Sequence, residues 1–326
     1  MSAYLRLSSS GASQKPSWYF YSTIAVIPPL SGFFYGIHTF WLAKYKKLVE
    51  YCQNGKPVPV PEDLKEMFNA VKNDLPNQDD FYKKFMNVFM VNGFDTFYAG
   101  STKTLYGGIV GIPKTFTYKS IKDAQDEAKD IRIQDSPIMW DYVEKEVKDK
   151  LFNSLVFSEK AIKYAMAYNC ILIDNVSAVF YAFYPALLAV SNGVIGDYTT
   201  NKYKLKNKPF IVQAAAALGI CTLSVCTWIS FVNVHKNLQE KTANKLVGEM
   251  DEEYLEGAIE YWSKIVDRNL ALRHLMKDGE SRYSPQGKEI FLLGSPGINP
   301  VDQKAIYEKL LEERKKKKER RENKTE

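Results

Sequence analysis

Residues 164–183 read YAMAYNCILIDNVSAVFYAF and change in character half-way along. The part up to residue 174 contains Asn169 and Asp174 and follows the charged residues Glu159, Lys160 and Lys163, whereas the part from residue 175 onward carries no charged side chain. A helix that starts in a soluble core and becomes wholly uncharged is typical of an entry into a bilayer. We therefore predict one continuous helix that acts as a rigid link between a soluble domain and a membrane span.

The rest of the chain contains two further uncharged runs, although its mean hydropathy is only −0.30. Each run exceeds the roughly 20 residues that cross a hydrocarbon core, and tryptophans lie near the ends of the runs, as is typical of membrane interfaces. The predicted membrane-spanning helices are residues 17–43, 176–196 and 209–234. A buried core helix is the alternative for each, above all for the second run, which Pro185, Ser191 and Asn192 interrupt.

The predicted spans divide the chain into membrane and soluble segments. A hairpin of two spans returns the chain to the same side of the membrane, so the stretches on either side of it can form one shared core. We predict an α+β membrane protein with three transmembrane helices and one mixed, mainly helical soluble domain. The segments outside the spans are a basic N-terminal segment (1–16), a first soluble segment (44–175), a Lys-rich loop (197–208), a second soluble segment (235–307) and a basic tail (308–326).

Local signals assign elements within the soluble segments. Residues 94–118 are rich in Gly, Thr and aromatic residues and predict strands with turns. Ser158 is a suitable N-cap for the next helix. A second amphipathic helix is predicted over 254–275, with its buried face formed by Leu255, Ile259, Trp262, Val266, Leu270 and Leu275. Gly279 is the predicted stop for that helix.

The sequence offers few groups for catalysis or metal binding. It has three histidines, no two of them at i and i+4, and it contains no GxSxG, P-loop or GxGxxG motif. A metal site needs several His, Cys, Asp or Glu side chains that converge on one point. We therefore predict no catalytic residue, no bound metal and no cofactor, and we expect no nucleic-acid partner.

The order of elements resembles that of membrane-bound zinc peptidases of the HExxH type. In those enzymes a zinc-binding helix adjoins a membrane hairpin, and a Glu after the hairpin completes the site. Tyr168, Asn169 and Leu172 would stand here in place of His, Glu and His, and they cannot replace them. The later ligand would fall among Glu252, Glu253 and Glu256. This comparison suggests a degenerate, peptidase-like scaffold.

Three segments resemble the transmembrane protein 177 family of mitochondria. They are GGIVGIPKTF (107–116), SEKAIKYAMAYN (158–169) and NLALRHLMKDGESRYSPQG (269–287). The last is the most specific. Its pattern consists of Asn269, Leu270, Arg273, Asp278, Gly279, Tyr283, Pro285 and Gly287, with Gly257 and Glu260 before it.

The resemblance implies a multi-pass protein of the mitochondrial inner membrane. It also implies a non-catalytic scaffold that associates with an assembly factor of cytochrome c oxidase and with newly made oxidase subunit II. Two alternatives stay open: a metallopeptidase-like protein with unusual catalysis, and a small-solute transporter. For a scaffold, we expect partner contacts on the spans and on the 254–275 helix, with Gly32 and Gly36 as a place where a partner helix could approach closely.

Overall fold

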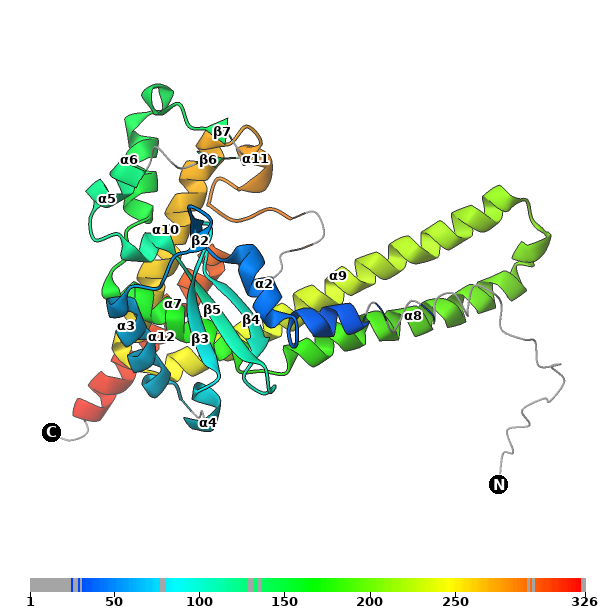
Figure 1. The fold of residues 1–326 in the computed structure, drawn as a ribbon, viewed down its shortest axis with the longest axis horizontal. Helices are drawn as coiled ribbons and strands as arrows, with labels where there is room; N and C mark the ends of the chain where they lie inside the picture. Colours follow the sequence, from blue (N-terminus) through cyan, green and yellow to red (C-terminus); the bar gives the residue numbers. More distant parts are fainter. Residues whose placement is uncertain are drawn as a thin grey trace. The chain divides into compact units, whose positions relative to one another are not determined.

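A computed structural model describes residues 31–76, 80–127, 132–133, 136–291 and 297–323, together with positions 25, 29 and 294. The chain forms two compact units. The first contains residues up to 34 and 180–229, and the second contains residues 35–179 and 230–326. Figure 1 shows the second unit as a small sheet surrounded by helices.

The sheet of the second unit has three strands in the order β3–β5–β4. These strands are β3 (Met86–Val91), β4 (Phe97–Ser101) and β5 (Gly107–Pro113). β5 runs antiparallel to β4 and parallel to β3. The β4–β5 turn therefore lies at the end of the sheet where β3 begins. The strands and turns expected within 94–118 are thus present as β4 and β5, and β3 is an element that the sequence did not signal.

Side chains alternate between the two faces of the sheet, as the period of a strand requires. Met86 and Met90 of β3 face the main core, which includes α7 (Glu159–Ile173). Phe89 and Val91 lie on the other face in a smaller cluster with Leu42. Leu42 belongs to α2 (Leu42–Val49), so one helix covers each face of the sheet.

Helices on both sides of the hairpin in sequence share the main core. α3 (Glu62–Asp74) and α7 precede the hairpin, whereas α10 (Glu252–Leu275) and α12 (Pro300–Glu322) follow it, and all four contribute buried residues. α6 (Lys145–Ser154) packs against α10. The remaining elements are β1 (Cys52–Gln53), β2 (Lys56–Pro57), α4 (Asp80–Lys83), η1 (Lys114–Thr117), α5 (Ile121–Asp126), β6 (Arg132–Ile133), β7 (Ser136–Pro137), η3 (Trp140–Tyr142) and α11 (Gly279–Arg282).

Two described helices are long and apolar enough to cross a membrane. They are α8 (Ser177–Lys202), which qualifies from Val179 onward, and α9 (Phe210–Glu249). Both extend beyond the predicted spans, and the connection between them, with η4 (Leu205–Asn207), is shorter than the predicted 197–208 loop. The helix continues through 197–202 because no breaker follows Gly196, and Lys202 donates a hydrogen bond to Tyr198 one turn earlier.

Most of the predicted span at 17–43 falls outside the described residues. Within it, residues 31–37 are helical and residues 38–41 form a turn before α2 begins at Leu42. The described portion of the chain therefore supports two membrane helices, and the third stays a prediction.

The predicted buried face of the helix at 254–275 is confirmed in part: Leu255 is buried, and Ile259 and Trp262 are half-buried against the main core. The centre of the buried face is shifted, because the buried residues of α10 also include Tyr254, Ala258, Tyr261 and Ile265. Tyrosine and alanine, which the apolar pattern did not count, form the inner face because α10 lies between several helices. Gly279 does not end the helix: α10 ends at Leu275, and Gly279 is the first residue of α11.

The basic tail belongs to a helix that packs in the core. α12 runs through the predicted boundary at 307/308, with Tyr307 completely buried. Leu310 packs against the core, and Arg314 donates a hydrogen bond to the carbonyl oxygen of Gly248. The first turns of α12 are thus fixed by packing, and its charged end continues the same helix.

Candidate functional site

The candidate site is the junction between α7 and α8, where the packed domain meets the first of the two described helices that are long and apolar enough to cross a membrane. The prediction of one continuous helix over 164–183 is wrong, because α7 ends at Ile173 and α8 begins at Ser177. Asp174 has φ −83° and ψ 58°, outside the helical region. Asn175 Oδ1 then accepts a hydrogen bond of 2.7 Å from the backbone N–H of Ser177, which caps the start of α8. Two short polar residues thus break the helix in the middle of an apolar sequence.

The turn between β4 and β5 holds this break in place. Thr102 Oγ1 donates a hydrogen bond of 2.5 Å to Asp174 Oδ1, and Lys103 Nζ lies 3.0 Å from the same oxygen. The backbone N–H of Thr102 donates to the carbonyl oxygen of Ile173, and Ser101 Oγ donates to that of Asn175. The last carbonyl group of α7 is therefore satisfied by the β4–β5 turn, and the carbonyl group of Asn175 by the end of β4. The junction is a fixed joint rather than a continuous helix.

A second polar contact joins the start of α8 to α9. Ser177 Oγ lies 3.1 Å from His235 Nε2, and Gln239 Nε2 donates to the same Ser177 oxygen. A serine beside an imidazole is a pair used in nucleophilic catalysis. Here the serine is buried, and Gln239 occupies its oxygen, so a substrate could not reach it without displacing Gln239. The contact is a clamp between the two helices at the base of the hairpin.

Beyond the clamp, α9 enters the domain through a network of buried polar side chains. Gln303 of α12 accepts a hydrogen bond of 2.7 Å from Asn244 and donates to Glu240 and to Tyr168. Tyr307 donates to Asn244 Oδ1 at 2.6 Å. A buried network of this kind fixes one arrangement of its helices, because each displaced partner would leave a polar group unpaired. The network ties the end of α9 to α7 and α12.

The positions that would correspond to a zinc site are used for packing. Tyr168, Asn169 and Leu172 are buried, and Asn169 Nδ2 donates to Thr96 Oγ1 and to the carbonyl oxygen of Ala165. Burial raises the pKa of the Tyr168 hydroxyl well above its usual value. These side chains are neutral members of a core.

Two of the three glutamates considered as a later metal ligand, Glu253 and Glu256, instead bind lysines of α7. Glu256 lies 2.7 Å from Lys160, and Glu253 lies 3.4 Å from Lys163. The hydrogen bond from Lys160 lowers the pKa of the Glu256 carboxyl group. Within the described residues, no group of three or more His, Cys, Asp or Glu side chains could hold a metal ion. The structure therefore gives no support to the peptidase-like scaffold.

The family motif at 269–287 folds back on α10 and closes a loop over it. Asn269 Nδ2 donates to the carbonyl oxygen of Gly287, and Arg273 donates to those of Tyr283 and Glu280. Gly287 has φ +78°, which suits glycine, and an added Cβ there would lie 2.9 Å from the carbonyl oxygen of Val266. The structure thus brings these motif residues together as a structural clasp.

The other motif residues lie around the same loop. Asp278 forms an ion pair with Arg282, and an added Cβ at Gly279 would lie 2.7 Å from the carbonyl carbon of Arg273. Leu270 lies beside Gly287, whereas Pro285 is exposed in the turn that ends there.

The two glycines predicted as a partner contact differ from each other. An added Cβ at Gly32 would meet nothing within 4 Å, so this position is open. At Gly36 it would lie 2.8 Å from the side chain of Trp41 and 3.0 Å from that of Phe40. The chain's own aromatic residues therefore cover Gly36, and a partner contact at Gly32 stays a prediction.

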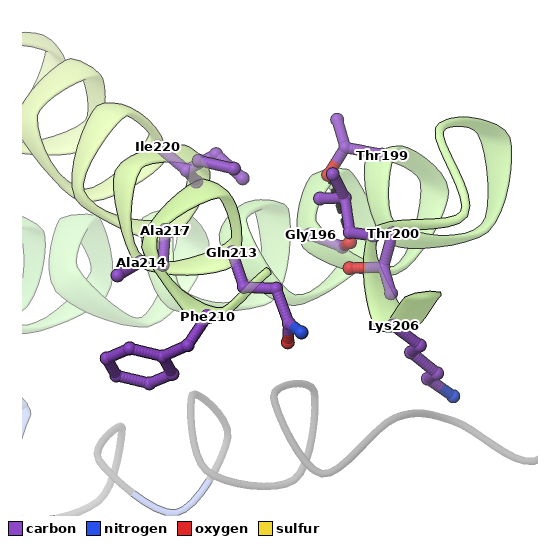
Figure 2. A pocket seen from close by; sticks show the side chains of 11 residues that line it. Gly196, Thr199, Thr200, Lys206, Phe210, Gln213, Ala214, Ala217 and Ile220 are labelled. Atoms are coloured by element: carbon purple, nitrogen blue, oxygen red, sulfur yellow. Dashed lines mark hydrogen bonds between the residues drawn. The ribbon is translucent and has the colours of Figure 1, made fainter. Parts of the chain in front are cut away.

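A pocket of about 390 Å³ lies near the tip of the hairpin, between α8 and α9. Figure 2 shows Ala214, Ala217 and Ile220 on one side and Thr199 and Thr200 on the other. Lys206, from the connection between the helices, also lines it. Apolar surface beside one cation suits a lipid better than a polar substrate.

The sequence showed a change in character near residue 174 and predicted a rigid helical link there, but it did not reveal the joint, the clamp or the buried network. The Asp174–Asn175 pair was the available signal, because short polar residues in an apolar run favour helix ends. No local pattern indicates that Thr102, His235 or Gln303 would be their partners.

The sequence matches one known protein family over most of its length. The family model of Transmembrane protein 177 matches residues 59–293. Human Transmembrane protein 177 is 26% identical over 244 residues, which cover 74% of this chain and 75% of the relative. The zebrafish (Danio rerio) protein of the same name is 24% identical over 253 residues, covering 77% of this chain and 79% of the relative. No solved structure matches the chain.

Proposed function

Because the chain belongs to the Transmembrane protein 177 family, we propose that it is a non-catalytic scaffold of the mitochondrial inner membrane. In this role it stabilises an assembly factor and newly made subunit II during the biogenesis of cytochrome c oxidase. Its own contribution is a fixed surface on which membrane-embedded partners are held.

The observation that carries the proposal is the polar joint at which the packed domain holds the residues that lead into α8. Asp174 and Asn175 are held by the β4–β5 turn, and Ser177 is held by His235 of α9. A scaffold needs such rigidity, because ordering a flexible surface on binding would reduce affinity. The polar groups at the joint bind each other, so their role is positioning.

The hairpin presents the surface that partner helices could use. Along α9, Ile211, Leu218 and Val225 recur every seven residues and are 76%, 69% and 52% exposed. That spacing places them on one side of the helix. Leu223, 64% exposed, is five residues from Leu218 and therefore faces about 140° away. Each of these two faces contacts either lipid or a partner helix. Crosslinking from each face distinguishes the two cases.

The test is site-specific photocrosslinking in intact mitochondria, combined with affinity purification of the tagged full chain. Crosslinkers are placed at Leu218 and Leu223, and a matched control is placed at Tyr142, which is 86% exposed in the soluble domain. We expect wild-type protein to recover an oxidase assembly factor and subunit II, with crosslinks from at least one hairpin position. Recovery of neither protein, or crosslinks from Tyr142 alone, would overturn the proposal.

A separate experiment tests the proposal that the protein is not an enzyme. Purified full-length protein in detergent is assayed for bound zinc and for peptide-bond hydrolysis, with Glu256→Gln as the variant and Glu313→Gln on α12 as the surface control. We expect no stoichiometric zinc and no turnover in any sample. Zinc or turnover that is lost in Glu256→Gln but kept in Glu313→Gln would show that the protein is an enzyme.

A further inference from the structure

The turn between β4 and β5 exposes apolar side chains that the domain itself does not bury. Leu105 is 93% exposed, and Tyr106 beside it is 52% exposed. The ring of Phe40, itself 51% exposed, lies 6.3 Å from the ring of Tyr106 and 5.2 Å from that of Trp41. We call Phe40, Trp41, Leu105 and Tyr106 the apolar turn surface. Single exposed apolar residues are common, but a contiguous group of this kind indicates a contact.

This surface lies close to the start of the first described membrane helix. Thr102, three residues before Leu105, is hydrogen-bonded to Asp174, and the membrane-competent portion of α8 begins at Val179. A chain spans at most ~3.6 Å per residue, so Leu105 lies within ~11 Å of Thr102. Figure 1 shows the β4–β5 turn beside the start of α8.

The second helix of the hairpin leaves the membrane at the same level. His235 of α9 lies 3.1 Å from Ser177, and the uncharged sequence of that helix ends at residue 234. The membrane boundary therefore passes near Ser177 and His235. The headgroup layer adds roughly 5–8 Å outside the hydrocarbon core, a thickness comparable with the ~11 Å limit on the separation of Leu105 from Thr102.

The charges around the turn suit lipid headgroups. Lys103 is exposed, lies 4.2 Å from the ring centroid of Tyr82 and pairs with Asp174. Lys84 is exposed just before β3, at the end of the sheet where the β4–β5 turn lies, and Lys44 is exposed near Trp41 in the sequence. Aromatic rings and lysines together are the residues that favour a membrane interface.

We propose that the apolar turn surface inserts into the lipid headgroup layer as a second, interfacial attachment of the soluble domain. The occupant of this surface is the bilayer itself. The two helices hold the domain at the membrane, and the inserted turn fixes how the domain is oriented on it. The inference rests on α8 and α9 crossing the bilayer and does not depend on any partner of the scaffold.

The experiment uses the purified full chain in liposomes of neutral and anionic phospholipids, without other proteins. Cys52→Ser, Cys221→Ala and Cys226→Ala remove the reactive thiols, and the buried Cys170 stays. A fluorophore is attached at Leu105→Cys, or at Tyr142→Cys as a control of similar exposure. Lipids with a nitroxide near the headgroup then quench any fluorophore that lies at the interface.

We expect the label at position 105 to be quenched several times more strongly than the label at 142 and to shift its emission to shorter wavelength. Equal quenching at the two positions, or no quenching at 105, would overturn the proposal. Because Leu105 is almost fully exposed, its replacement should leave the fold intact, which a melting curve of each labelled protein verifies.

Discussion

Replacing Gly257 with alanine should weaken the contact on which the soluble core depends. Gly257 of α10 faces the backbone of α7, where an added Cβ would lie 2.6 Å from the carbonyl carbon of Lys160 and closer still to its oxygen. Backbone atoms cannot turn aside as a side chain can. The two helices must therefore move apart by at least about 0.8 Å to bring the carbonyl carbon to an ordinary contact of 3.4 Å, and by more to clear the oxygen.

The expected magnitude follows from two opposing effects. Overpacking a core costs about 1–3 kcal/mol, and a clash with backbone belongs at the upper end of that range. Alanine in a helix interior is favoured over glycine by about 1 kcal/mol. The net loss in the free energy of unfolding is about 2 kcal/mol, which lowers Tm by about 4–8 °C for a domain of this size.

Gly248 of α9 provides the matched control. An added Cβ there would lie 3.3 Å from Leu310 Cδ1, the end of a flexible side chain. Gly248→Ala should therefore keep its gain in helix propensity and raise Tm by about 1–4 °C. Both variants are melted as full chains in the same detergent. A Gly257→Ala protein that melts within about 1 °C of wild type would refute the reasoning, because the close approach would then carry no energetic cost.

Three further outcomes can be checked in the same preparation. Tyr307→Phe removes the donor to buried Asn244 and should cost about 1–3 kcal/mol, measured by chemical unfolding; an unchanged midpoint would mean that water replaces the hydroxyl group. Burial raises the pKa of Glu289, so its ionised form is disfavoured in the folded state. Burying the ionised carboxylate therefore lowers the free energy of unfolding at any pH above the folded-state pKa, and this loss disappears once the pH falls below the unfolded-state pKa. Glu289→Gln should therefore raise Tm at pH 7 but not at pH 4. A rise in Tm at pH 4 but not at pH 7 would contradict the burial argument. Burial raises the pKa of Cys170 to about 12. A maleimide at pH 7.5 should therefore modify exposed Cys52 quickly and Cys170 only on unfolding. Equal rates of modification of Cys52 and Cys170 in the folded protein would show that Cys170 is accessible.

Features that depend on composition along the chain could be predicted from the sequence. Two uncharged runs correspond to α8 and α9, and Ser158 caps α7 by accepting a hydrogen bond from Ala161 N–H. The amphipathic helix after the hairpin exists as α10. Hydrophobic length and capping chemistry are local properties, so one sequence contains enough information to read them.

Features that depend on tertiary contacts could not be predicted from the sequence. The break after Ile173 was missed because an apolar run is read as uninterrupted unless Gly or Pro ends it, whereas here Thr102 and Lys103 stabilise the bend from the sheet. The buried face of α10 was predicted only in part because Tyr261 was not counted as apolar, although its ring packs 5.6 Å from that of Tyr164. Contacts between residues far apart in sequence decide such cases, and no periodicity records them.

The position of α10 also changes where partner recognition should be sought. α10 packs against α7, α12 and α6, and the motif loop closes over its end, so its surface is largely occupied. Glu256 and His274 are the residues of this helix that stay exposed. A substitution at a buried position within 254–275 would therefore reduce binding of any partner through loss of the fold, whereas Glu256 and His274 can be changed at the surface. The motif that marks the family is a folding device, with Asn269 and Arg273 binding the carbonyl groups of the returning loop. Surfaces that can be changed without unfolding the domain lie on α8, α9 and the β4–β5 turn, and variants at those positions can separate recognition from stability.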